Sequence, residues 1–202
     1  MLGLGADVVG GILKAVGFGA GAITGALKDV FSLGAGSVGF ILNNLGFGVN
    51  TITKALSDVF SLGADALGGI LKGLGFDASA ITGALKTVVG LGADAIGLVL
   101  KGLGFGADQI AGALSSVFTL GASAVGAILQ TLGFGANAIA HALQQAGALY
   151  GLAWIPEADE ASRRFYARAG WEPDGSVRAF DTGDGTLREI RVTGSLDLKL
   201  TD

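Results

Sequence analysis

Six residues in the second half of the chain could hold an anion. Residues 130–135 read QTLGFG, and a run with helical periodicity, ANAIAHALQQA, follows at 136–146. Glycines directly before a helix leave backbone N–H groups free to point at a phosphate, and the positive end of the helix dipole favours the negative charge. If this segment is a phosphate loop, the candidate cofactor-binding residues are Gln130, Gly133 and Gly135.

A second candidate for chemistry is the phenol of Tyr166, in the segment ASRRFYARAGWEPDG (161–175). A phenol has a pKa of about 10 and can act as a general acid. His141, the only histidine, shares a repeated column with Lys54, so we expect it on the surface. Without cysteine or a second histidine we expect no metal site. The segment DTGDG (181–185) lacks the spacing of a calcium loop and predicts a hairpin turn.

Composition limits the partners and the compartment. The chain has 202 residues, a net charge of -4, 15% charged residues and no basic run, so we expect no nucleic-acid partner. The N-terminus shows no basic region typical of a signal peptide. A nearly uncharged stretch extends over 109–156, but glycine-containing breaks recur about every 15 residues. Because a membrane span needs about 20 continuous apolar residues, we expect a cytoplasmic protein, with membrane contact as a less favoured alternative.

Residues 1–147 repeat one 29-residue unit five times. Within each copy, apolar residues recur at offsets of 3, 4, 7 and 8, which predicts two amphipathic helices of about three turns. Helices of that length are marginal alone and must stack on one another. We therefore predict a mainly α fold, a solenoid or stacked array of short helix pairs. The copies start at Leu4, Leu33, Leu62, Leu91 and Leu120.

The glycine columns of the repeat mark where helices end and begin. The column of Gly17 follows a helix, where a left-handed residue is expected, and the column of Gly19 takes the next N-cap, with Asp77 there in the third copy. The column of Gly10 lies in mid-helix, four residues after small Ala6, and predicts close approach of two helix backbones. In this frame QTLGFG is the fifth copy of a helix stop and start, aligned with KAVGFG, NNLGFG, KGLGFD and KGLGFG.

The remaining repeat columns indicate packing and surface. One Phe per copy predicts an aromatic ladder in the core. Lys28, Lys86 and Lys101, together with scattered Asp, predict a thin solvated face. That face is poor in charge and rich in Ala and Gly, which favours self-association or a protein partner.

The composition changes near Gly147. All six Arg lie after residue 160, whereas six of the seven Lys lie before residue 102. We place a domain boundary here, with the repeat domain at 1–147 and a second segment at 148–202. The second segment reads as a strand ended by Pro156, a helix with Asp159 as a candidate cap, and a β-hairpin, which is a small α+β tail.

The tail resembles the end of the GNAT superfamily of N-acetyltransferases over about 55 residues. The resemblance rests on Phe165, Tyr166, Gly170, Trp171, Pro173, Asp174 and Gly175, followed by LREIRV. It implies the family's fifth strand, fourth helix and last two strands. It also implies acetyl-CoA as cofactor, Tyr166 as proton donor to the departing thiolate, and QTLGFG as counterpart of the family's Q-x-x-G-x-G loop. Asp159 and Ser162 depart from the family's frequent Asn and Ala.

Helical repeats occupy the place of the family's first four strands, so the slot for the thioester is missing. We therefore rank first a structural or protein-interaction repeat protein whose GNAT-derived fragment is not catalytically competent alone and needs no cofactor. The alternative is an acetyl-CoA-dependent N-acetyltransferase of unusual build, and the third hypothesis is a membrane-associated, glycine-rich helical protein. The deciding observation is whether any strand before Ala148 pairs with LYGLAWIP (149–156).

Overall fold

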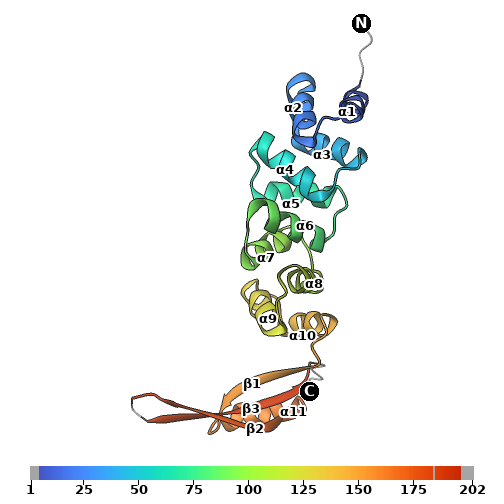
Figure 1. Cartoon of the computed structure of the whole chain (residues 1–202). Coiled ribbons are helices and arrows are strands. Elements are labelled where there is room, and N and C mark those ends of the chain that lie inside the picture. Colours follow the sequence, from blue (N-terminus) through green and yellow to red (C-terminus); the bar gives the residue numbers. More distant parts are fainter. Residues whose placement is uncertain (1–4, 184, 197–202) are drawn as a thin grey trace. The chain divides into compact units, whose positions relative to one another are not determined.

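The structure, a computed structural model, describes residues 5–183 and 185–196. A series of short helices comes first and a small antiparallel sheet follows (Figure 1), which confirms the predicted fold class. The chain divides into two compact units, Met1–Gly121 and Ala122–Asp202. Helix gives way to strand between Gln145 and Tyr150. The domain boundary at Gly147 stays a prediction.

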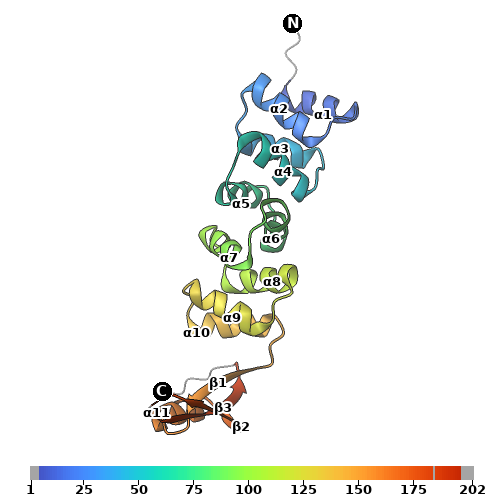
Figure 2. The same cartoon turned by 60° about the vertical axis from the view of Figure 1, so that its left-hand side comes forward.

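The first unit holds four helix pairs in two layers (Figure 2). Odd-numbered helices follow one another in one layer, and even-numbered helices follow one another in the other, so each repeat contributes one helix to each. The third repeat ends its second helix in a π-helical turn, η1. The elements are α1 Ala6–Ala15, α2 Ala20–Phe31, α3 Ala35–Asn44, α4 Val49–Phe60, α5 Ala64–Gly73, α6 Ala78–Ala84, η1 Leu85–Val89, α7 Ala93–Gly102 and α8 Ala107–Phe118.

Both predicted helix caps are confirmed. Gly17, Gly46 and Gly75 follow their helices with φ of 96°, 76° and 89°, the left-handed region that a residue with a Cβ rarely adopts. Asp77 caps α6, because its Oδ1 accepts the N–H of Ala80 at 2.8 Å.

The layer of even-numbered helices also buries a column of threonines that the sequence analysis did not single out. Thr24, Thr53 and Thr82 are fully buried. The hydroxyls of Thr53 and Thr82 each donate to the carbonyl four residues earlier, at 2.7 Å, so each helix satisfies its own polar group. The hydroxyl of Thr24 has no hydrogen-bond partner in the described part of the chain.

The second unit holds the fifth helix pair and the tail. The three strands form an antiparallel sheet in the order β1-β3-β2, with Ile155 opposite Ile190 and Val177 opposite Ile190. The hairpin predicted around DTGDG is present, since β2 ends at Asp181 and β3 begins at Thr186. The elements are α9 Ala122–Thr131, α10 Ala136–Gln145, β1 Tyr150–Pro156, α11 Glu160–Arg168, β2 Glu172–Asp181 and β3 Thr186–Ser195.

The core of the tail is built around Trp171. Its indole packs in a cluster with Ile155 and Val192, and the indole N–H donates to the carbonyl of Ser195 at 3.1 Å. The ring lies against the backbone of β3, where a Cβ on Gly194 would fall 2.2 Å from the ring carbon Cδ1. A Cβ on Gly151, which lies opposite Gly194 on β1, would fall 2.5 Å from the ring carbon Cη2, so both glycines leave room for the indole.

Candidate interaction surface

Successive repeats interlock through glycine sockets. A Cβ on Gly10 would lie 3.2 Å from Ile41 and 3.4 Å from Leu45, both from the next repeat. The same pair of positions meets the socket glycines of the second and third repeats: Ile70 and Leu74 at Gly39, and Val99 and Leu103 at Gly68. The prediction that these glycines bring two helix backbones together was wrong, because the nearest atoms are branched side chains that fill the space a Cβ would take.

Exposed lysine side chains also connect the first repeat to the second and the third repeat to the fourth. Lys28 Nζ donates to the carbonyl of Val59 at 2.8 Å and lies 5.2 Å from the ring centre of Phe60. Lys86 repeats the arrangement with Val117 and Phe118, at 2.7 Å and 4.6 Å. Lys14 and Lys72 bind the carbonyls of Leu45 and Leu103 and lie over Phe47 and Phe105.

These four lysines have one physical role. Each places an ammonium group at the C-terminus of a helix in the next repeat, where the carbonyl oxygens carry the negative end of the helix dipole. Each also lies over an aromatic ring, which adds a cation–π attraction. Lys28 and Lys86 are exposed, as the sequence analysis expected. Their side chains also bind the next repeat, which the sequence analysis did not expect. In the sequence, these contacts correspond to a lysine that stands 31 residues before the residue whose carbonyl it binds.

We expect Lys86→Gln to lower the free energy of unfolding by about 1 kcal/mol, because it removes the charge from both interactions. Lys54→Gln is the matched control, since Lys54 pairs only with Asp58 of its own helix, on an exposed surface. That variant should lose less than about 0.5 kcal/mol. Urea unfolding followed by circular dichroism measures both. Equal losses in the two variants would contradict the role given to Lys86.

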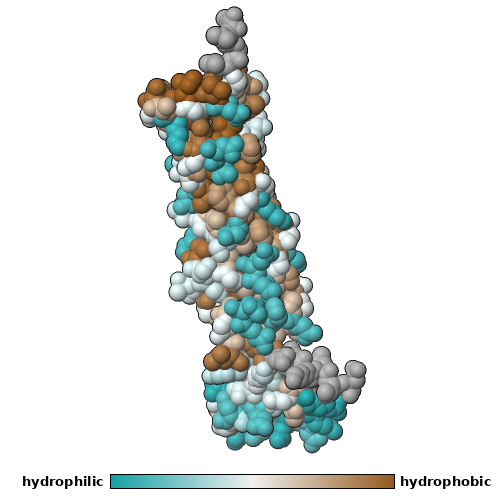
Figure 3. Space-filling view, turned by 90° about the vertical axis from the view of Figure 1, so that its right-hand side faces the viewer, coloured by the Kyte–Doolittle hydropathy of each residue, from teal (hydrophilic) through white to brown (hydrophobic). Residues whose placement is uncertain are grey.

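The first repeat exposes apolar side chains whose equivalents in the second repeat are buried or partly buried. Val16 and Val30 are 65% and 74% exposed, and Ile12 is half exposed, whereas Ile41, the equivalent of Ile12 in the second repeat, is 5% exposed. Val8 lies four residues before Ile12 on the same helix face and is also exposed. The apolar side chains gather at the α1 end of the stack (Figure 3). We call Val8, Ile12, Val16, Phe18 and Val30 the leading face.

The fifth repeat exposes the complementary positions. A Cβ on its socket glycine, Gly126, would meet only Leu143 and Ile139 of the same repeat. Ile139 and Leu143 are partly exposed and Ala136 is exposed, whereas their equivalents in the first repeat, Ala20, Ile23 and Leu27, are buried. We call Gly126, Ala136, Ile139 and Leu143 the trailing face.

The proposed phosphate loop has the geometry of the repeat. Gln130 is an exposed residue of α9, Gly133 follows that helix with φ of 76°, and Gly135 is the N-cap of α10 in extended conformation. Gly104 and Gly106 have the same conformations in the fourth copy. The loop therefore carries no local feature that distinguishes it from a copy not considered for phosphate binding.

Tyr166 lies at the edge of the tail core. It is half buried, and its ring centre is 5.2 Å from that of Trp171 and 5.2 Å from that of Phe165. Asp159 caps its helix as predicted, since its Oδ1 accepts the N–H groups of Ala161 and Ser162. The hydroxyl of Ser162 also donates to Asp159, and these bonds lower the pKa of the Asp159 carboxyl.

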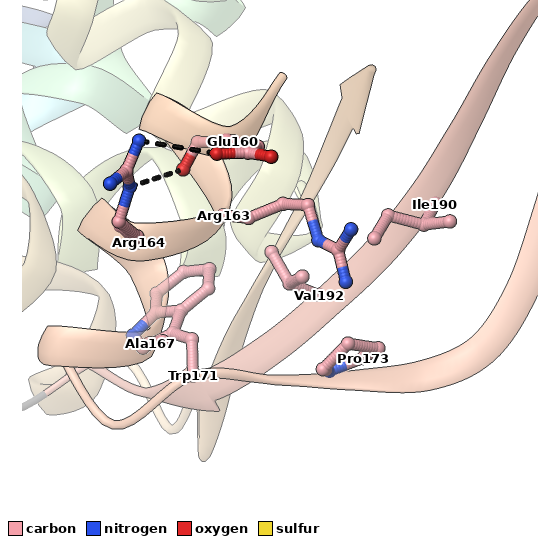
Figure 4. A pocket seen from close by; sticks show the side chains of 8 residues that line it. All are labelled: Glu160, Arg163, Arg164, Ala167, Trp171, Pro173, Ile190 and Val192. Atoms are coloured by element: carbon pink, nitrogen blue, oxygen red, sulfur yellow. Dashed lines mark hydrogen bonds and ion pairs between the residues drawn. The ribbon is translucent and has the colours of Figure 1, made fainter. Parts of the chain in front are cut away.

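A cavity of about 400 Å³ lies between α11 and the sheet (Figure 4). Trp171, Ile190 and Val192 give it an apolar floor. At its rim Arg164 pairs with Glu160 at 3.4 Å, while Arg163 extends over the floor. Neither Tyr166 nor any of the three loop residues lines this cavity. Its lining residues are Glu160, Arg163, Arg164, Ala167, Trp171, Pro173, Ile190 and Val192.

Strand pairing answers the question raised by the sequence. Among the described residues, strand β1 pairs with β3 alone, and residues 5–149 form helices, turns and irregular segments but no strand. The described residues thus provide no second strand beside β1 to form a thioester slot.

The sequence analysis also made expectations about His141, a metal site and a membrane span. His141 is exposed, as expected. Within residues 5–183 and 185–196, no three His, Cys, Asp or Glu side chains gather as metal ligands would. No helix in the same ranges has both the length and the apolar character needed to cross a membrane. No family model and no curated protein matches this chain.

Proposed function

We propose that this chain is a structural or protein-interaction protein, a stack of short helix pairs that acts by contact with other proteins. The observation that carries the proposal is the interlocking surface of the repeats. At three successive joints, a socket glycine of one copy receives two branched side chains of the next copy. The leading face presents the equivalent side chains uncovered. Exposed apolar surface of this kind is typical of an interaction site.

In this proposal the tail is a GNAT-derived fragment without catalytic competence of its own. Three observations support that part: β1 has a single partner strand in the described ranges, Tyr166 packs against Trp171, and the loop residues do not line the tail cavity. No cofactor is then required.

The competing proposal is an N-acetyltransferase of unusual build that binds acetyl-CoA through Gln130, Gly133 and Gly135 and uses Tyr166 as the acid. It predicts coenzyme binding that depends on one loop. Gly135 is the informative residue, because its extended φ of -70° accepts a side chain, whereas Gly133 is left-handed. Gly106 is the matched control, an N-cap glycine of the same conformation in the fourth copy.

Isothermal titration calorimetry with acetyl-CoA at millimolar concentration separates the two proposals. We expect no binding heat from the intact chain. Binding heat that Gly135→Val abolishes and Gly106→Val preserves would overturn the structural proposal in favour of the enzyme. Heat that both variants preserve would overturn it as well, and would place the coenzyme outside the loop.

A further inference from the structure

We infer that the leading face binds the trailing face of a second copy of this chain, so that molecules join head to tail. The inference rests on the proposed interaction function and names the partner. The contact would continue the interface that already joins repeats within the first unit.

The first step is shape. At Gly10, Gly39 and Gly68, a β-branched residue and a leucine from the next repeat fill the socket. On the leading face, Ile12 and Val16 occupy these two positions and have no preceding socket in the described residues. On the trailing face, Gly126 is a socket whose only described neighbours within 4 Å, Leu143 and Ile139, belong to its own repeat. The two faces are therefore the two halves of one interface.

The second step is apolar extent. The column of Val8 holds Ser37, Ala66, Ala95 and Ala124 in the later copies, so the first repeat carries a larger apolar side chain there than any other. Val8, Ile12 and Val16 follow one another at intervals of four residues and form one stripe along α1. Burying this stripe against a trailing face removes apolar surface from water, which is the main favourable term in association.

The third step is hydrogen bonding at the helix ends. Within the first unit, lysines bind the carbonyls of Leu45 and Val59. The equivalent carbonyls of the first repeat belong to Val16 and Val30. On the fifth repeat, the lysine columns hold Gln130 and Gln144, whose side-chain amides can donate to the same carbonyls without charge. A head-to-tail contact thus keeps a donor at each lysine position.

This geometry has a definite consequence for size. A contact between two different faces leaves one free face at each end, so growth does not stop at a dimer. We expect sedimentation velocity to show species that grow beyond a dimer as the concentration rises from about 1 μM to hundreds of μM, the range of weak interfaces.

Two blocking variants test the orientation. Ile12→Lys with Val16→Lys blocks the leading face, and Gly126→Lys blocks the trailing face while replacing a mid-helix glycine by a better helix former. Each variant alone should be a monomer, because it keeps only one of the two complementary faces. An equimolar mixture of the two variants should form a dimer and nothing larger, because it contains one intact leading face for each intact trailing face. Leu98→Lys, at an exposed apolar side chain of an inner repeat, is the control and should associate as the original chain does. Circular dichroism of each variant confirms that the helices are intact.

Several outcomes would overturn the inference. A monomer at every concentration excludes a second copy as the occupant. Dimers of Gly126→Lys alone would indicate contact between two leading faces. If the chain stays monomeric but binds phosphatidylcholine vesicles, and the leading-face variant loses that binding, the leading face binds lipid and not a second copy. In each of these cases the calorimetry with acetyl-CoA still decides separately between a structural protein and an enzyme.

Discussion

Gly68→Leu should weaken the helical stack by about 2 kcal/mol, even though leucine favours a helix far more than glycine does. A Cβ at this position would lie 3.0 Å from the Leu103 side chain and 3.1 Å from that of Val99. The rest of a leucine would have to enter space those side chains already fill. In close-packed interiors such overfilling typically costs about 1 to 3 kcal/mol. We expect the upper end of this range here, and the gain in helix propensity of about 1 kcal/mol leaves a net loss of about 2 kcal/mol.

The neighbouring residue supplies the control for this prediction. Gly69 lies in the same helix and is exposed, and a Cβ there would be 3.9 Å from its nearest neighbour, an ordinary contact. Gly69→Leu should therefore stabilise the stack by about 1 kcal/mol. Thermal unfolding followed at the helical signal should shift in opposite directions for the two variants. A stabilised Gly68→Leu would show that the socket is not needed for stacking.

Gly194→Val should unfold the tail while the helices stay intact. The Cβ of any residue here would fall within 2.2 to 2.7 Å of three atoms of the Trp171 ring, so the indole must leave the core. The loss of a buried tryptophan side chain typically costs about 3 to 5 kcal/mol. A core made of few buried side chains has little stability to lose.

The position of the tryptophans makes this prediction easy to measure. Both tryptophans, Trp154 and Trp171, belong to the tail, so intrinsic fluorescence reports on the tail while circular dichroism reports mainly on the helices. The fluorescence of Gly194→Val should resemble that of unfolded protein before any denaturant is added. Thr193→Ile adds bulk to the same strand on the opposite face and should keep the native emission. Native emission from Gly194→Val would mean that β3 can shift to accept a side chain.

Periodicity within the sequence was sufficient to predict the helices and their ends. Five aligned copies separate positions that always hold a small residue from positions that vary, and Asp77 in a column of glycines identified the N-cap that the structure confirms. The same alignment identified QTLGFG as a helix stop and start. Such local features depend on residues close in sequence, which is why one chain alone reveals them.

Contacts between copies were not predicted, and the reason is geometric. The lysine caps and the filled sockets join residues about one repeat apart, at distances fixed by how one helix pair lies on the next. Helical spacing within a copy does not determine that arrangement. In the tail, Gly194 reads as an ordinary strand residue until the position of Trp171 is known. The assignment of Tyr166 to an acetyltransferase site rested on resemblance and stays a prediction.

The glycine socket repeated between copies has a consequence for how such a chain can change in length. If residues 33–61 were deleted, Ile70 and Leu74 would meet Gly10, as Ile41 and Leu45 do now, and Lys14 would meet the end of α5. The glycine socket and its two branched side chains would be kept, while Lys28 would face Val89 in place of Phe60. Whole-copy insertion or loss can thus change the number of helix pairs while the glycine sockets between copies are kept.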